Sequence, residues 1–383
     1  MAMGRVKAGW RVFNNSFAIE AKEASRNPVL HWLGWLFPLI LFALISGIFS
    51  EGTMLELPVS VVDQDHSSLS RQLIRRLDAG SHAQVVPYDG GLAESLTRLR
   101  SAEDYALLYI PKGFEADVLA GRQPKVQMYY NALFYGAGLY ASQDFSGLMA
   151  DLNAHYRALL QPSLGEAIPP LAQVEINYDS LFNASSSFIY YQQFAATIHL
   201  LQLFVVTCMI YVLDKRKYLL RARPFGLAVL GKLAPYTLAY TTLLMVQIAI
   251  MVFVFDANIN GNPLLMPLVG FFYVMAAQCI GILLFTFTAS SLSAYSFIGM
   301  FVSIAMGFSG MAVPELSMPL IAQVIANIEP LTHALYAMFD IFLRDVPVSA
   351  ILSVCAILMI YPLVTWIIVR KRLLKRFHLE DRG

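Results

Sequence analysis

Polar side chains recur on one face of an otherwise uncharged run, Phe188 to Leu213. Gln192, His199 and Gln202 fall near one face of a helix, and Tyr191 lies beside them. Polar groups in a long apolar run are costly to bury, so these four residues are candidates to line the path of a substrate. Hydrogen bonds between helices that hold a dimer together are the alternative interpretation. The sequence leaves both open.

A second polar cluster, Asp63, Asp65 and His66, has the composition of a metal site. It follows a hydrophobic stretch and directly precedes Ser67 and Ser68, an order that is typical of a turn followed by a capped helix. We therefore interpret the cluster as capping groups.

Sequence motifs for catalysis are absent from the chain. It contains no G-x-x-x-x-G-K-S/T loop, no dinucleotide-binding glycine pattern and no H-E-x-x-H helix. All three cysteines, Cys208, Cys279 and Cys355, lie inside apolar runs, where neither disulfide nor metal-ligand spacing occurs. We expect no catalytic residue, no cofactor, no metal and no nucleic-acid partner, so the chain is not an enzyme by itself.

The composition is that of a membrane protein, with 57% hydrophobic and only 14% charged residues. The stretch from Ala257 to Pro314 contains no Asp, Glu, Lys or Arg. As one helix it would be about 87 Å long, whereas the hydrocarbon core of a bilayer is about 30 Å thick. The run must fold back, and the small polar cluster from Thr288 to Ser293 is the place for it.

The uncharged runs predict six transmembrane helices and divide the chain into 1–30, 31–50, 51–187 and 188–383. Residues 1–30 read as an amphipathic helix in the headgroup plane, with Val6, Trp10, Phe13 and Phe17 at helical spacing. The predicted spans are His31 to Phe49, Phe188 to Leu213, Leu233 to Phe255, 264–288, 293–313 and Val346 to Val369.

Charge sets the predicted orientation. Lys and Arg concentrate in the leader, in the link 214–232 between the second and third helices, and in the C-terminal tail, all on one side of a six-helix path. The positive-inside rule makes that side cytoplasmic, which places both termini in the cytoplasm and segment 51–187 outside. The basic link either only enforces this topology or also docks a cytoplasmic partner. The interleaved Tyr218, Leu219, Leu220 and Phe225 favour docking.

Segment 51–187 alternates strand and helix patterns. Four stretches read as strands: Leu57 to Asp63, Ala83 to Pro87, Tyr105 to Ile110 and Lys125 to Tyr130. Three read as helices: Ser67 to Leu77, Leu92 to Arg100 and Tyr140 to Leu160. This order predicts an α/β domain with a largely parallel sheet. The predicted fold class is therefore an α-helical integral membrane protein of six transmembrane helices, with an α/β extracytoplasmic domain inserted between helices one and two.

The outer connection 314–344 is too apolar for an ordinary loop, and Pro314, Pro319 and Pro330 interrupt its helical patches. Broken half-helices that dip into the outer leaflet are tolerated when they pack against protein, so we expect a re-entrant segment. Its outer gate would carry Glu315, Glu329, Pro330 and His333.

Several of these stretches resemble the membrane subunit of an ABC-2-type exporter. The pattern S-G-x-x-x-P-x-x-x-M-P at 309–319 is followed by Pro-Leu-Thr-His at 330–333, and the outer segment carries Val-Val-Asp-Gln-Asp at 61–65 and Ile-Pro-Lys-Gly-Phe at 110–114. Gly231 and Lys232 at the start of the third helix are similar as well. The outer motif residues are Ser309, Gly310, Pro314, Met318, Pro319 and Gln323.

The resemblance implies two permease subunits, alike or different, paired with separate ATPase subunits that bind ATP and Mg. In such exporters the leader helix and the link contact the ATPase. The family's link usually carries Glu-Arg-Glu-x-Gly-Thr, whereas this chain reads Asp-Lys-Arg-Lys from residue 214, which would suit one half of a heterodimer. By position, the ATPase-coupling residues would be Arg5, Arg11, Asp214, Lys215, Arg216, Lys217, Arg221, Arg223 and Pro224.

The resulting hypothesis is a multi-pass permease of the cell inner membrane that moves an amphipathic, lipid-like or drug-like molecule outward while a partner ATPase hydrolyses ATP. Membrane lipids surround it, and a periplasmic adaptor is a further candidate partner. The rival hypothesis is a membrane-anchored receptor or assembly scaffold, whose outer domain binds a ligand or adaptor without transport.

Overall fold

The structure is a computed structural model. It describes residues 2–380 apart from 51, 87–89, 102, 121, 123, 132–134, 165–186, 216–218, 220–221 and 312. The chain divides into two compact units, which are described separately. Unit 1 comprises Met1–Ser50 and Ser180–Gly383, and unit 2 comprises Glu51–Asp179.

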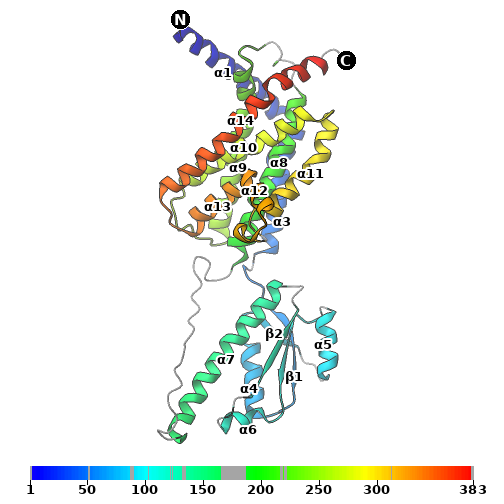
Figure 1. Cartoon of the computed structure of the whole chain (residues 1–383), viewed down its shortest axis with the longest axis vertical. Helices are drawn as coiled ribbons and strands as arrows, with labels where there is room; N and C mark the ends of the chain where they lie inside the picture. Colours follow the sequence, from blue (N-terminus) through cyan, green and yellow to red (C-terminus); the bar gives the residue numbers. More distant parts are fainter. Residues whose placement is uncertain are drawn as a thin grey trace. The chain divides into compact units, whose positions relative to one another are not determined.

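Unit 1 is a helical bundle (Figure 1). Within the described residues, six helices are long and apolar enough to cross a membrane, which confirms the predicted number. The first combines α2 (Pro28–His31), the π-helical turn η1 (Trp32–Leu36) and α3 (Phe37–Ile48). The others are η3 with α8 (Ile189–Gln193, Phe194–Asp214), α9 (Phe225–Val254), α10 (Leu265–Phe287), α11 (Ser291–Phe308) and α14 (Val348–Glu380).

The long uncharged run breaks where its small polar residues predict. Thr288 has extended backbone after α10, and the Ser290 hydroxyl accepts a hydrogen bond from the Ser293 amide at 3.1 Å. Serine at this position satisfies one of the free amides that every helix start leaves open. The cap therefore fixes the start of α11.

The core of unit 1 centres on α8 and α10. Tyr240 of α9 and Tyr273 of α10 are fully buried. The Tyr240 hydroxyl donates to the Phe204 carbonyl at 3.1 Å, and the Tyr273 hydroxyl donates to the Ile198 carbonyl at 3.0 Å. A hydroxyl in an apolar core needs such a partner, so both bonds fix the position of α8 in the bundle.

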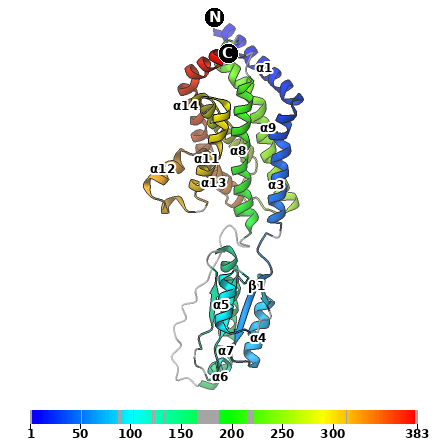
Figure 2. The same cartoon turned by 90° about the vertical axis from the view of Figure 1, so that its right-hand side faces the viewer.

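The N-terminal leader is one helix, α1 (Ala2–Arg26), and it packs along α9 (Figure 2). Its protein-facing side holds Ser16 and Glu20, both nearly inaccessible. The aromatic residues at helical spacing form a separate stack in which Trp10 is 63% exposed. The predicted helix is thus present, with Ser16 and Glu20 against the protein, Trp10 exposed, and Phe13 and Phe17 half-buried.

The outer connection folds as short helices: η5 (Glu315–Ser317), α12 (Leu320–Ile328) and α13 (Pro330–Leu343). Pro314, Pro319 and Pro330 each lie at or next to the start of one of them, where a missing N–H costs nothing. At about 1.5 Å per residue, neither α12 nor α13 is long enough to cross a bilayer. Figure 2 shows α12 at the periphery of unit 1.

Unit 2 contains a four-stranded sheet in the order β2-β1-β3-β4. β1 (Leu57–Asp63) pairs in parallel with β2 (Ala83–Val86) and β3 (Ala106–Ile110), and β4 (Gln127–Tyr130) is antiparallel to β3. The prediction of a largely parallel α/β sheet is confirmed. The helices are α4 (Ser68–Asp78), α5 (Leu92–Arg100), α6 (Phe114–Leu119) and α7 (Tyr135–Leu164).

Both faces of this sheet are covered. Val59 of β1 packs into a cluster with Leu73 of α4, Phe114 of α6 and Leu152 of α7. On the opposite face, Val62 joins a smaller cluster with α5. Figure 1 shows α4 and α7 on one side of the strands and α5 on the other. Burial on both faces explains the nearly continuous apolar reading of β1 and β3.

Candidate functional site

A buried ion pair joins α1 to α9 at the basic end of unit 1. The Lys232 ammonium lies 2.6 Å from a Glu20 carboxylate oxygen, and the two side chains are 1% and 3% exposed. The Tyr236 hydroxyl donates to the other Glu20 oxygen at 2.8 Å. Lys232 also donates to the Lys215 carbonyl at 2.9 Å. One ammonium group therefore connects the leader helix, the α8–α9 link and α9.

Glycine permits this close approach. A Cβ atom added at Gly231 would lie 2.4 Å from the Phe13 carbonyl oxygen of α1. At Gly9 it would lie 2.8 Å from a Leu227 methyl group. At Gly231 the neighbour is backbone and leaves no room for a side chain, so this glycine is required for the packing of α1 on α9, whereas the Leu227 side chain near Gly9 can move aside.

The structure describes five of the predicted ATPase-coupling side chains. Asp214 accepts a hydrogen bond from the Ser291 hydroxyl of α11 at 2.7 Å, and the Lys215 ammonium lies 4.7 Å from the Tyr211 ring centre. Arg11 on α1, together with Arg223 and Pro224 before α9, is exposed. Arg216, Lys217 and Arg221 lie outside the described residues, as does the side chain of Arg5.

Arg376 of α14 has a role that the sequence analysis did not assign. Its guanidinium donates to the carbonyls of Phe285 and, at 2.6 Å, Thr288, and it stacks over the Phe285 ring. These contacts satisfy carbonyls that the end of α10 leaves open, and a cation there is also favoured by the helix dipole. A basic residue in a basic tail gave no signal that distinguished it from its neighbours.

Near the middle of the bundle, Gln202 of α8 joins three elements. Its amide nitrogen donates to a Glu329 carboxylate oxygen at 2.7 Å, and its amide oxygen lies 3.1 Å from the Tyr273 hydroxyl of α10. Gln202 and Tyr273 are buried, and Glu329 is half-buried. Gln202 therefore makes hydrogen bonds between helices of one chain, and one of its partners is a carboxylate.

The four predicted substrate-path residues do not form one site. Tyr191 and Gln202 are eleven positions apart, which is about 16 Å along a helix, and the π-helical turn η3 contains Tyr191 and the half-buried Gln192. The Tyr191 hydroxyl donates to the Met311 carbonyl. His199 is half-buried, and its Nδ1 has no hydrogen-bond partner among the described residues. Only Gln202 contacts the mid-bundle carboxylate.

Tyr191 instead lines a cavity of about 250 Å³ at the other end of the bundle. Tyr190, Tyr336 and Phe339 supply further aromatic walls. Asp340 and Arg344 also line it and form an ion pair with an N–O distance of 3.1 Å. The cavity is therefore aromatic and balanced in charge, and its volume is just below the usual range of ligand pockets, about 300–1,000 Å³.

The predicted outer-gate residues surround the junction of α12 and α13. Glu315 accepts a hydrogen bond from the Asn327 amide, and the His333 imidazole lies 2.9 Å from the Asn327 carbonyl. Pro330 begins α13, directly after Glu329. Asn327 thus links Glu315 and His333, while Glu329 points away from them toward α8.

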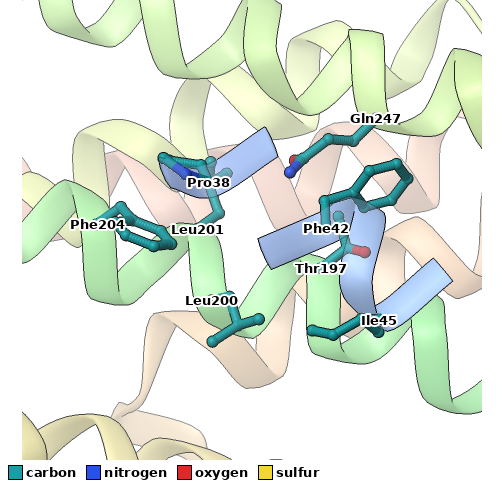
Figure 3. Close-up of a pocket in the computed structure, with 8 residues that line it drawn as sticks. All are labelled: Pro38, Phe42, Ile45, Thr197, Leu200, Leu201, Phe204 and Gln247. Atoms are coloured by element: carbon teal, nitrogen blue, oxygen red, sulfur yellow. The ribbon is translucent and has the colours of Figure 1, made fainter. Parts of the chain in front are cut away.

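A second cavity between α3, α8 and α9 is nearly closed. Figure 3 shows Phe42, Leu201 and Phe204 around it, with the Gln247 amide at its edge. Its free space is about 10 Å³, which is at most one water molecule. In this conformation it is a packing defect that cannot hold a substrate.

The acidic cluster of unit 2 caps helices, as interpreted from the sequence. Asp65 accepts the backbone amides of Gly113 and Glu115 at 2.8 and 3.0 Å at the start of α6. The Ser67 hydroxyl and these amides lower the pKa of Asp65, because they stabilise its charged form. Asp63 accepts the Ser70 hydroxyl at 2.6 Å.

Within the residues that the structure describes, no group of three or more His, Cys, Asp or Glu side chains is placed to hold a metal ion. A search of curated proteins gave no match. Residues 30–371 match a family described as ABC-2 family transporter protein, a match that includes all six candidate spans except the ends of the first and last. The chain therefore belongs to the ABC-2 family of transporter membrane proteins.

Proposed function

We propose that this ABC-2 membrane subunit is the permease half of an exporter, which moves an amphipathic molecule outward when a separate ATPase subunit acts on its basic end. Family membership implies an ATPase partner, and permease subunits of this family lack ATPase activity themselves. The proposal concerns how this chain couples to that partner, in which direction it transports and what it moves.

The Glu20–Lys232 pair carries the proposal. An ATPase that binds exposed cations on α1 and on the link can move α9 only if α1, the link and α9 are held together by a rigid joint. The ammonium of Lys232 provides that joint, since it contacts a carboxylate on α1 and a carbonyl on the link. Separating buried opposite charges costs several kcal/mol, so α1, the link and α9 would move together.

Charge supports the orientation. The described part of α1, the α8–α9 link and the end of α14 carry exposed cations, including Arg11, Arg223, Arg370, Lys371 and Lys375. Positive charge is typical of the cytoplasmic side, and on this rule unit 2 and the α12–α13 connection would lie outside. A molecule that passes between the helices from the basic end would therefore leave the cell.

Exposed apolar side chains on α11 favour a second permease subunit. Leu292, Phe297, Met300 and Phe301 are each at least 38% exposed on a helix that packs against α8. In the family's two-subunit arrangement a second chain would cover part of this face and complete a path between the halves. Lipid would cover the rest.

The test is co-purification with the cognate ATPase, followed by ATP-driven transport in proteoliposomes. The triple variant R216E/K217E/R221E should lose the ATPase, while the matched reversal R370E/K371E/K375E on α14 changes the net charge equally and should retain it. Wild-type protein without an associated ATPase would contradict the proposal and support the receptor or scaffold hypothesis. Equal ATPase binding by the two triple variants would show that the link is not part of the contact with the ATPase.

A further inference from the structure

Glu329 holds its carboxylate against the middle of a transmembrane helix. Gln202, its hydrogen-bond partner, lies in the continuous helix Ile189–Asp214. At about 1.5 Å per residue, Gln202 is about 20 Å from the Ile189 end of that helix and about 18 Å from the Asp214 end. The junction of α12 and α13 therefore brings an acidic group to the middle of a helix that is long enough to span a membrane.

The carboxylate is oriented by buried groups. Gln202 is 1% exposed, and its amide oxygen lies 3.1 Å from the hydroxyl of the fully buried Tyr273. The single Tyr273 hydroxyl hydrogen is shared between the Ile198 carbonyl at 3.0 Å and the Gln202 amide oxygen at 3.1 Å, and the Gln202 amide nitrogen then faces Glu329. The Tyr361 hydroxyl of α14 donates to the Ile328 carbonyl at 2.8 Å and fixes the adjoining backbone. Three transmembrane helices thus define the position of one carboxylate.

No cation among the described residues pairs with Glu329. The buried acid Glu20 pairs with Lys232, and Asp340 pairs with Arg344. In the part of the chain that the structure describes, the side chain that hydrogen-bonds Glu329 is the neutral Gln202. The nearest imidazoles along the contacting elements are His199 on α8 and His333 on α13, and the His333 ring contacts the Asn327 carbonyl. An acid at this depth without a counter-charge is costly, and such residues mark the pathways of ions and substrates.

We propose that the Glu329 carboxylate, positioned by Gln202, is the counter-charge for a cationic group of the transported molecule, so that the substrate class is an amphipathic cation. The inference rests on the proposed export function and adds the substrate's charge and the residue that recognises it. In a low-dielectric region, attraction between opposite charges is several times stronger than in water, so one fixed carboxylate is sufficient to discriminate a cation from its neutral analogue.

The shape of the site fits an organic cation better than a metal ion. One carboxylate and one amide provide too few oxygen ligands for a divalent ion. Ile328, the residue before Glu329, is 67% exposed, which provides apolar surface next to the charge. A hydrocarbon chain attached to an ammonium group matches both features.

The experiment measures equilibrium binding to the full chain in nanodiscs of zwitterionic lipid. The probes are a fluorescent dansyl alkylamine and its N-acetylated, uncharged derivative. Wild-type protein should bind the amine about tenfold more tightly than the amide. The E329Q variant, which keeps a hydrogen-bonding group of the same shape, should lose this preference. The matched variant D345N, which neutralises an exposed acid between α13 and α14, should retain it.

A second variant tests the positioning role. Q202L leaves the carboxylate in place but removes its hydrogen-bond donor, and it should reduce the preference several-fold. Equal binding of the two probes by wild-type protein, or an unchanged preference in E329Q, would overturn the inference. Export itself is tested separately by ATPase co-purification and ATP-driven transport, so this site can fail while the proposed function stands.

Discussion

Replacing Lys232 with methionine is expected to destabilise the packing of α1 on α9 by about 3–5 kcal/mol, because it leaves the Glu20 carboxylate buried without a counter-charge. Methionine has nearly the volume of lysine, so charge is lost and packing is largely kept. The Tyr236 hydroxyl remains 2.8 Å from Glu20. This remaining bond places the expected cost near the lower limit, about 3 kcal/mol.

The double variant E20Q/K232M separates the ion pair from the rest of the interface. With both charges removed, no buried charge is left unpaired, and the Tyr236 hydroxyl can donate to the new amide oxygen. We expect the double variant to recover most of the stability lost in K232M, with a coupling energy of about 2–4 kcal/mol between the two positions.

Hydrogen exchange of the α1 amides, measured on the full chain in nanodiscs, reports this local stability. A loss of about 3 kcal/mol would accelerate exchange on the order of 100-fold in K232M. Y236F, which removes only a neutral donor, should have a smaller effect. If the effects of E20Q and K232M simply add in the double variant, the pair is not coupled and the reasoning for α1 is wrong.

Two further predictions concern single contacts. Gly231→Ala would place its Cβ 2.4 Å from the Phe13 carbonyl oxygen and should lower the local stability of α1, measured by hydrogen exchange, by about 1–3 kcal/mol. Gly47→Ala, where the added Cβ meets nothing within 4 Å, should leave the exchange of α1 unchanged. Equal effects of the two variants would contradict the close approach of α1 to α9. The pKa of Asp65 is lowered by the Ser67 hydroxyl and backbone amides, so its contribution to unit 2 is present above its unfolded pKa of about 3.9 and is lost as pH falls through the lower folded value. Exchange of α6 amides should therefore accelerate below about pH 4 in wild-type protein and lose this pH dependence in Asp65→Asn; an identical pH profile in both would refute it.

The transmembrane helices could be predicted from sequence because a bilayer leaves few alternatives. In hydrocarbon, the backbone N–H and C=O groups must find their hydrogen-bond partners within the same segment, so an uncharged run of about twenty residues has to be a helix. The same logic located the turn at Ser290. In unit 2, alternating strand and helix patterns with short connections predicted the parallel sheet, although α6 was missed because it is only six residues long.

The candidate site was predictable only in part. Gln202 could be selected because an amide in an apolar run needs a partner, but its partner Glu329 lies 127 positions away. Helical periodicity also grouped Tyr191 with Gln202, since a helix face says nothing about depth. The structure places the first at an aromatic cavity and the second at the bundle centre.

The amino-acid sequence alone determined the six membrane-spanning helices and the α/β domain inserted between the first and second of them. The reason is that lipid requires long uncharged segments and water requires charged ones, and both requirements act on local stretches of sequence. Which charges meet was decided only by tertiary packing. In the sequence, Glu20 and Lys232 are ordinary members of a charged leader and a basic link. They become a buried pair because Gly231 lets α1 approach α9 closely. This approach removes both charges from water, and a buried charge is tolerated only when it is paired with an opposite charge.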